Sequence, residues 1–95
     1  MDGRKNDIGK LRWDLLPWSE IEQIVSTLTY GSVKYSDNNW KIVVSANPKR
    51  YVAAAMRHFV SWIKGERLDP ESGKHHLAHC ACCILFLLWQ DKDKS

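Results

Sequence analysis

The stretch YVAAAMRHFVSWIKGERLDPESGKHHLAHCACCILFLLW, residues 51–89, predicts two helices joined by a turn. Its first half places apolar residues at helical spacing, which predicts a helix over about 49–66: Val52, Met56, Phe59, Val60 and Ile63. Its second half repeats the pattern over about 73–90, with Leu77, Ala81, Ile84, Leu85 and Leu88. The segment LDPESG between them holds Asp-Pro and Ser-Gly, which are turn signals. Because the turn is short, we expect antiparallel neighbours.

The helix predicted over 73–90 is apolar on every side. Phe86, Leu87 and Trp89 occupy the sides that its leucine face leaves open. A helix that is apolar all round is buried all round, and a chain of 95 residues has a small core of its own. We therefore expect a homo-oligomer, a dimer or a tetramer.

Ahead of this pair, the sequence predicts one further helix and an arm. Ser19 and Glu22 have the spacing of a capping box, and they start a helix over about 19–35. Residues 1–18 are expected to form an extended arm of a single domain that spans 1–95. The segment YSDNNWKIVVSANPK, residues 35–49, is predicted as a loop, and only 42–44 could form a strand. The fold class is all-α: three antiparallel helices that a second chain completes to a bundle.

Charge, cysteines and hydropathy narrow the classes of function. The net charge is only +3, and basic residues are scattered among acidic ones, which does not favour direct nucleic-acid binding. Three cysteines close together form a poor disulfide framework and favour a reducing compartment. The longest apolar run, CACCILFLLW, is too short to span a bilayer. We expect a cytoplasmic protein with no membrane contact.

Carboxylates and histidines on the predicted helices point to a metal site. Helical geometry puts Glu66 near the apolar stripe, where a carboxylate needs a partner or a cation. If helix 19–35 lies antiparallel to helix 49–66, Glu22 comes level with Glu66 and with Asp69 in the turn. Helical bundles hold hard divalent cations in this way.

The histidines of the pair are expected at the same end of the bundle. The short turn places His76 near Glu66, and it places His79 near His58.

Each of these residues also has a structural explanation. Glu22 suits the capping box, Asp69 and Glu71 suit the start of the third helix, and His58 suits a satisfied core position. A zinc site in HHLAHCACC is disfavoured, because every soft ligand lies on one helix and structural zinc draws on separate elements. Buried small hydrophobes are the favoured role for the cysteines.

Three segments carry a resemblance to a known family. They are DIGKLRWDLLPW at 7–18, LTYGSVKYSDNNW at 28–40, and YVAAAMRHFVSWIKGERLDPESGKHHLAHCACC at 51–83. In this order they resemble the small phage and prophage dATP/dGTP diphosphohydrolases, which belong to the all-α nucleoside-triphosphate pyrophosphohydrolases related to MazG. The wider MazG-like pattern has an E-x-x-E pair that is incomplete here, because Val25 stands three residues after Glu22.

The resemblance implies Mg²⁺- or Mn²⁺-dependent hydrolysis of a purine deoxynucleoside triphosphate to the monophosphate and pyrophosphate, for phage nucleotide-pool control in the host cytoplasm. Glu22, Glu66 and Asp69 are the expected metal ligands, and Glu66, Asp69 and His79 the expected catalytic groups. Either a carboxylate or His79 is suited to take a proton from water.

The expected substrate contacts lie along the whole chain. They are Lys10, Arg12, Lys34 and Arg57 for the triphosphate, Asn39 and Trp40 for the base, and His58. Tyr30 and Trp62 are alternative base stackers, and simple packing explains Trp40 equally well.

Two functions of other classes compete with the enzyme. A small helical nucleic-acid-binding or regulatory module would use the same Lys, Arg and Trp without catalysis. A zinc-stabilised interaction module would explain the cysteines but not the carboxylates.

Overall fold

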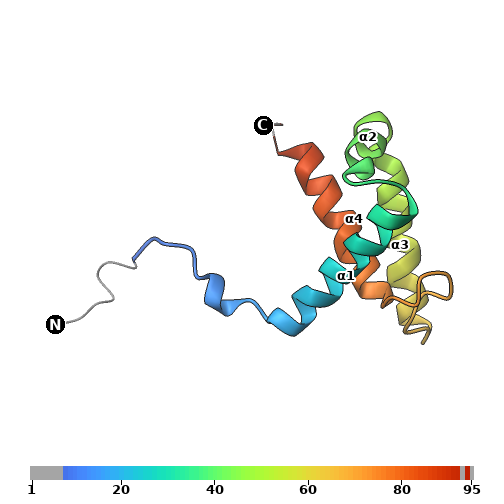
Figure 1. Cartoon of the computed structure of the whole chain (residues 1–95), viewed down its shortest axis with the longest axis horizontal. Helices are drawn as coiled ribbons and strands as arrows, with labels where there is room; N and C mark the ends of the chain where they lie inside the picture. The colour runs from blue at the N-terminus through green and yellow to red at the C-terminus, as the bar shows by residue number, and fades with distance from the viewer. Residues whose placement is uncertain (1–7, 93, 95) are drawn as a thin grey trace.

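The computed structural model of the chain describes residues 8–92 and residue 94, and this part is all-α as predicted. It contains four α-helices, α1 (Trp18–Lys34), α2 (Asn39–Ala46), α3 (Pro48–Ile63) and α4 (His76–Asp91), and a short 3-10 helix, η2 (Trp13–Leu15) (Figure 1). The described residues hold no strand, only an isolated bridge between Leu68 and His75. The expectation of three helices is therefore wrong by one.

Helices α3 and α4 form the predicted pair and run in opposite directions (Figure 1). Pro48 occupies the first turn of α3, where its missing N–H costs nothing. The helix ends three residues earlier than expected, and Gly65 then adopts a φ of +102° that favours glycine. Helix α4 begins three residues later than expected, where His75 Nδ1 accepts from the Leu77 N–H. The connection is a loop over 64–75.

Helix α2 corrects the predicted loop at 35–49. Its residues 42–44 are β-branched and disfavour a helix by propensity, but packing overrides that weak preference. Val44 is completely buried, and the Trp40 ring stacks on Phe86 of α4 with centroids 4.5 Å apart. Asn38, at φ 60°, turns the chain into this helix.

The start of α1 differs from the predicted capping box. The helix begins at Trp18 after Pro17, and neither side chain of the expected box caps it. Ser19 Oγ instead donates to Glu20 Oε1 at 2.8 Å, and Glu22 is exposed. The capping explanation for Glu22 is therefore wrong.

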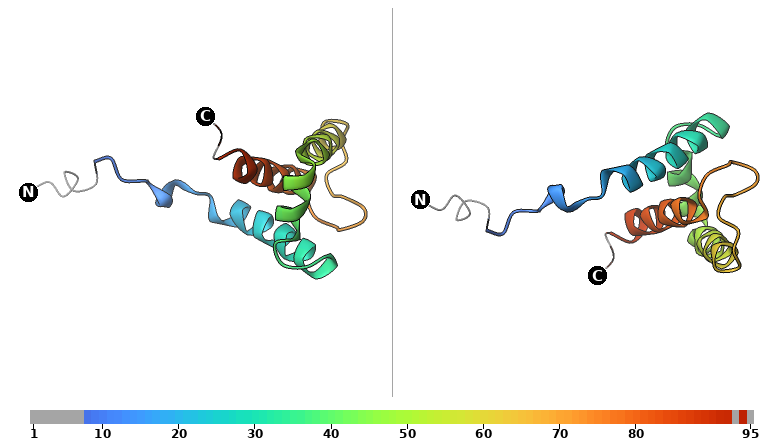
Figure 2. Two further views of the ribbon diagram at one scale, coloured as in Figure 1. Left: turned by 90° about the horizontal axis from the view of Figure 1, so that it is seen from above. Right: turned by 90° about the horizontal axis from the view of Figure 1, so that it is seen from below.

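The course of α1 also differs from the expectation. It crosses α4 instead of lying antiparallel along α3 (Figures 1 and 2). At the crossing, Cys82 Sγ donates to the Ile24 carbonyl at 3.7 Å. Lys74 Nζ donates to Ser26 Oγ at 2.7 Å and ties the loop to the middle of α1. These contacts lie near the middle of α1.

The apolar stripe of α3 is the largest departure from the predicted core. Its side chains are 43% to 63% exposed: Val52, Met56, Phe59, Val60 and Ile63. The half-buried side of α3 is small and polar instead, with Tyr51, Ala54, Ala55, His58 and Ser61. Ile84 and Leu88 of α4 are also more than half exposed. Within one chain, the predicted core face is a surface.

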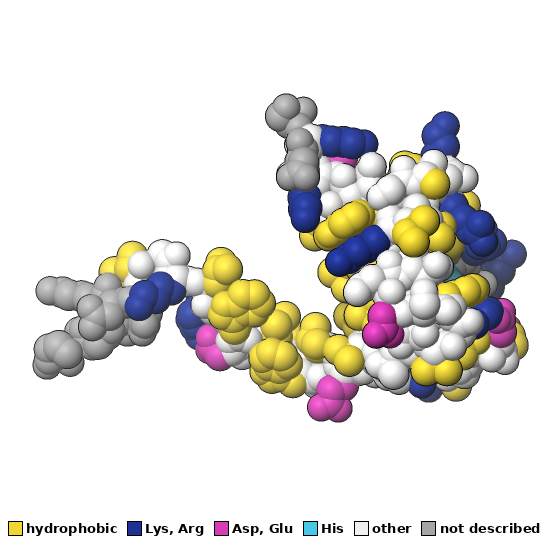
Figure 3. Space-filling model, turned by 45° about the horizontal axis from the view of Figure 1, so that its top comes forward, with side chains coloured by type: hydrophobic (Ala, Val, Ile, Leu, Met, Phe, Trp, Pro, Cys, Tyr) yellow, Lys and Arg dark blue, Asp and Glu magenta, His cyan; other side chains and the backbone are white. Residues whose placement is uncertain are grey.

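The arm projects from the helices, and hydrophobic side chains follow it (Figures 1 and 3). Leu11, Trp13, Leu15 and Trp18 are each more than half exposed. Arg12 forms a two-pronged ion pair with Asp14 at 2.7 and 2.8 Å. None of the helices in residues 8–92 has both the length and the apolar character needed to cross a membrane.

Candidate active site

Two histidines from neighbouring helices face each other at the loop end of the α3–α4 pair. His58 Nδ1 lies 2.8 Å from His76 Nδ1, and His76 Nε2 lies 2.7 Å from Glu66 Oε1. His76 is almost fully buried, at 3% exposure. The expected closeness of His76 and Glu66 is confirmed. Glu66 itself lies beyond the end of α3 with its side chain 51% exposed, so the expectation that it faces the core is wrong.

A second hydrogen-bonded chain runs beside the first. Asp69 Oδ2 accepts from the Ser72 N–H at 2.9 Å and from Ser72 Oγ at 2.8 Å. Ser72 Oγ also lies 2.6 Å from His79 Nε2. The His79 ring stacks on His58 with centroids 4.5 Å apart and planes 7° apart, which confirms that these two are neighbours. Stacking thus joins the two chains into one cluster.

Burial and charge set the protonation of this cluster. Burial, with the neighbouring His79 and His76, lowers the pKa of His58 to about 4. Burial also lowers the pKa of His79. Burial opposes ionisation of Asp69, but the two hydrogen bonds from Ser72 outweigh it and lower the pKa of this carboxyl. At neutral pH His58 and His79 are therefore uncharged and lie beside the Asp69 carboxylate.

The predicted metal ligands are only partly brought together. In residues 8–92, one set of three ligand-type side chains has its donor atoms within 4.8 Å of one another: His58, Asp69 and His76. Glu66 touches this set through His76, but Glu22 does not belong to it. The expected convergence of Glu22 with Glu66 and Asp69 is wrong, because α1 crosses α4 with its C-terminal half toward the cluster.

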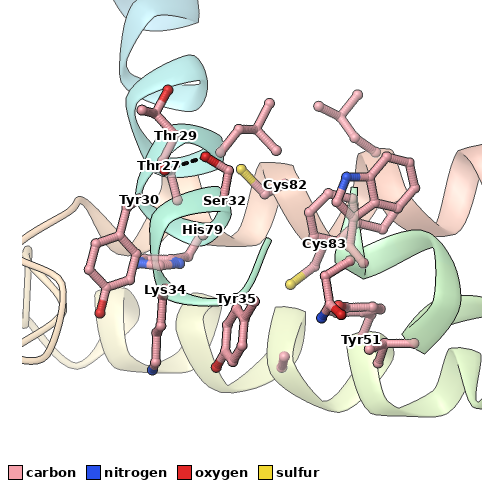
Figure 4. Close-up of a pocket in the computed structure, with 18 of the residues that line it drawn as sticks. Thr27, Thr29, Tyr30, Ser32, Lys34, Tyr35, Tyr51, His79, Cys82 and Cys83 are labelled. Carbon is pink, nitrogen blue, oxygen red and sulfur yellow. Dashed lines mark hydrogen bonds between the residues drawn. The ribbon is translucent and has the colours of Figure 1, made fainter. Parts of the chain in front are cut away.

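A pocket of about 740 Å³ opens beside the cluster (Figure 4). His58, Asp69 and His79 line one part of it, and Trp40 and Tyr51 line another. The end of α1 contributes Lys34 and Tyr35, which point toward α3 in Figure 4. The volume suits a nucleotide-sized ligand.

The pocket separates the predicted substrate contacts into two groups. Lys34, Asn39, Trp40 and His58 line it. Lys10, Arg12 and Arg57 do not: the first two lie on the projecting arm, and Arg57 is exposed on α3. A single chain therefore offers fewer cations to a triphosphate than the sequence predicted.

Charge and packing already engage two of the predicted contacts. Lys34 Nζ pairs with Glu71 Oε1, and this hydrogen bond raises the pKa of Lys34. Trp40 stacks on Phe86 at one face and meets Trp89 edge-on at 5.2 Å. The packing explanation for Trp40 thus has direct support, while Tyr35 lines the pocket with 63% of its surface exposed.

Several residues of the site were not predicted as functional. Arg50 and Tyr51 line the pocket from the start of α3, where neither spacing nor a motif singles them out. Ser72 and Glu71 stand in the turn, and the sequence suggested only helix capping for the carboxylate. Both residues stand in a polar turn close in sequence to the histidines, and this position is the feature of the sequence that could have identified them.

The cysteines behave as packing residues. Cys82 and Cys83 are buried, Cys82 against α1, and Cys80 is half-buried. Burial raises the pKa of Cys82 to about 12 and that of Cys83 to about 11. They stay protonated at neutral pH, as expected for small buried hydrophobes.

Comparison with known proteins identifies the family. Residues 1–95 match the family described as dATP/dGTP diphosphohydrolase, N-terminal. Over 89 residues the chain is 33% identical to the dATP/dGTP diphosphohydrolase of Salmonella phage PMBT28, which covers 94% of this chain and 30% of that relative, so the chain spans about a third of its length. No solved structure matches the chain. As its motifs predicted, the chain belongs to the N-terminal family of the dATP/dGTP diphosphohydrolases.

Proposed function

We propose that the chain hydrolyses purine deoxynucleoside triphosphates, dGTP or dATP, to the monophosphate and pyrophosphate. The observation that carries this proposal is the cluster of His58, Asp69 and His79 on the wall of a nucleotide-sized pocket. Family membership and the printed activity of the phage relative support the choice of substrate.

Different residues of the pocket contact the triphosphate and the base. The triphosphate lies toward Lys34 and the histidines, and the base lies toward Tyr35 and Asn39. A water oxygen bonds to the α- or the β-phosphorus, and the bond from that phosphorus to the oxygen bridging the α- and β-phosphates breaks. Attack at the α- or the β-phosphorus gives the same two products.

We assign His79 as the group that receives the proton of the attacking water. Its ring is uncharged at neutral pH, and Ser72 and Asp69 hold it in place from the loop. Glu66 acts through His76, as a positioning residue.

A divalent cation, Mg²⁺ or Mn²⁺, is implied by the family resemblance. Asp69 remains a suitable holder, joined by His58 and His76 in place of Glu22, while Glu66 orients His76. This mixed nitrogen and oxygen set fits Mn²⁺ better than Mg²⁺, which prefers oxygen ligands alone. When bound, the cation offsets charge on the phosphates.

We also propose that the chain forms a homo-oligomer, a dimer or a tetramer. The exposed stripe of α3 and the exposed leucines of α4 form apolar surface of the kind that subunit interfaces cover. Lys10 and Arg12 do not line the pocket of their own chain, so the substrate contact predicted for them requires the pocket of a second copy.

The biological setting follows from the substrate. Free deoxynucleoside triphosphates are cytoplasmic, and the relative is a phage protein. We propose that the chain controls a phage nucleotide pool in the host cytoplasm.

Chromatography of the products tests the activity. The chain is mixed with each dNTP and NTP in the presence of Mg²⁺ or Mn²⁺, with EDTA as the control. We expect dGMP or dAMP with pyrophosphate, and none when EDTA is present. His79→Gln should lose at least about 100-fold in kcat, whereas His75→Asn, which keeps a helix-capping side chain, should retain activity. No turnover of any nucleotide would favour the non-catalytic regulatory module.

A further inference from the structure

His58 and His76 direct two nitrogen donors at one point. Their Nδ1 atoms are 2.8 Å apart. A carboxylate only accepts hydrogen bonds, so the bond at 2.7 Å to Glu66 requires the hydrogen of His76 to sit on Nε2. In the uncharged form of His76, Nδ1 then carries the lone pair, which is directed toward His58. Two imidazole nitrogens this close together require either a hydrogen or a cation between them.

Asp69 brings an oxygen donor to the same point. Its donor atom lies within 4.8 Å of those of both histidines. The two hydrogen bonds from Ser72 both fall on Oδ2. No hydrogen bond within residues 8–92 falls on Oδ1, which is therefore available to a ligand. Oδ2 therefore fixes the position of the carboxylate, and Oδ1 is free to bind a ligand.

These separations match those around one metal ion. With bonds of about 2.0–2.2 Å, two adjacent ligands on one ion are about 2.8–3.5 Å apart. The nitrogen pair fits this range at 2.8 Å, and the Asp69 donor atom lies within 4.8 Å of both nitrogens. A hydrogen shared by the two imidazoles would explain their separation but not the third donor.

We propose that His58, Asp69 and His76 bind one first-row transition ion, such as Mn²⁺, Co²⁺ or Zn²⁺, in preference to Mg²⁺. Two imidazoles and one carboxylate favour such ions, and three protein ligands leave positions open for water or a phosphate oxygen. Glu66 orients His76 from behind, as carboxylates do for metal-bound histidines. This inference rests on the proposed function only for the use of the ion in hydrolysis.

Binding of Co²⁺ to the full chain, freed of metal with a chelator, tests the site directly. Co²⁺ held by histidine nitrogen gives visible absorption bands whose growth reports affinity without any substrate. We expect saturation at one ion per chain, and no displacement by an equal concentration of Mg²⁺. Bands that stay absent, or that equal Mg²⁺ removes, would overturn the proposal.

Variants locate the ion. Asp69→Asn, which keeps an oxygen acceptor for Ser72, and His58→Gln should each weaken Co²⁺ binding more than 100-fold. Glu66→Gln should weaken it about 10–100-fold. His75→Asn, one residue from the buried ligand, is the matched control and should bind like the original chain. Equal binding by Asp69→Asn and the control would refute the assignment, and circular dichroism confirms that each variant is helical.

The two proposals fail separately. Hydrolysis of dGTP with Mg²⁺ and no Co²⁺ binding would overturn this site and leave the proposed function intact. Co²⁺ binding that depends on Asp69, with no hydrolysis of any nucleotide, would support the site and overturn the proposed function.

Discussion

At the scale of single residues, the cluster is built so that each group fixes its neighbour. Glu66 fixes the hydrogen of His76, and His76 then determines what His58 can present to it. Ser72 fixes Asp69 and His79 with one hydroxyl. Because these links are serial, a change at the exposed end of a chain should be felt at its buried end.

Protonation of His58 should destabilise the fold. Its pKa of about 4 lies below the ordinary 6.5, so between these values the unfolded chain binds a proton that the folded chain excludes. The free energy of unfolding should therefore fall as pH drops from 6.5 toward 4, and His79 adds in the same direction. Among the described residues, His76, His79 and Arg57 oppose the charge on His58, and Asp69 favours it.

Urea unfolding at a series of pH values measures this effect. His58→Gln should flatten the dependence between pH 6.5 and 4, whereas His75→Asn should keep it. An unchanged slope in His58→Gln would show that other groups cause the acid sensitivity.

Lys34 and Lys10 separate the pocket from the arm. Lys34 lines the pocket and Lys10 does not. Lys34→Met should raise KM for the triphosphate about tenfold, because a charged hydrogen bond to phosphate is lost. Lys10→Met should leave KM unchanged if one chain forms the whole site. If Lys10→Met instead raises KM, the arm of a second copy contacts the substrate in the pocket.

At the scale of elements, the sequence predicted what local patterns control. Periodicity located α1, α3 and α4, and Asp69-Pro70 and Gly73 located the turn. It missed α2, because the β-branched run at 42–44 becomes helical only through contacts with α3 and α4. It misplaced Glu22 for a related reason: the angle at which α1 crosses α4 depends on packing that no local pattern encodes.

Trp40 tests whether α2 serves packing or base recognition. Its stack on Phe86 predicts that Trp40→Ala lowers the free energy of unfolding by about 2–3 kcal/mol, below the range for a fully buried tryptophan. Trp40→Phe should recover more than half of that loss, with KM for dGTP little changed. If Trp40→Ala leaves the stability unaltered and raises KM for purine nucleotides, Trp40 contacts the base, as the sequence predicted.

At the scale of the whole molecule, one chain encloses little. The buried hydrophobic residues within the described part are Val44, Ala78, Cys82 and Cys83. The inner side of α3 carries His58 and Ser61, while its apolar stripe faces outward. Periodicity identified that stripe correctly but could not say which chain covers it. The interface between α3 and α4 therefore holds polar side chains. The stability that an apolar interior would supply must come instead from association with another chain.

The oligomer can be tested through that stripe. Phe59 lies within it at 45% exposure, whereas Val33 of α1 lies outside it at 83% exposure. In a symmetric dimer each substitution occurs twice at the interface, so Phe59→Glu would bury two charges in an apolar contact. We expect light scattering to show an oligomer for the original chain and for Val33→Glu, and a monomer for Phe59→Glu. If the original chain is a monomer, or if Phe59→Glu keeps the oligomer mass, the α3 stripe is not the interface between copies. In the first case a different partner must cover it, since so much apolar surface on so small a core leaves the isolated chain only marginally stable.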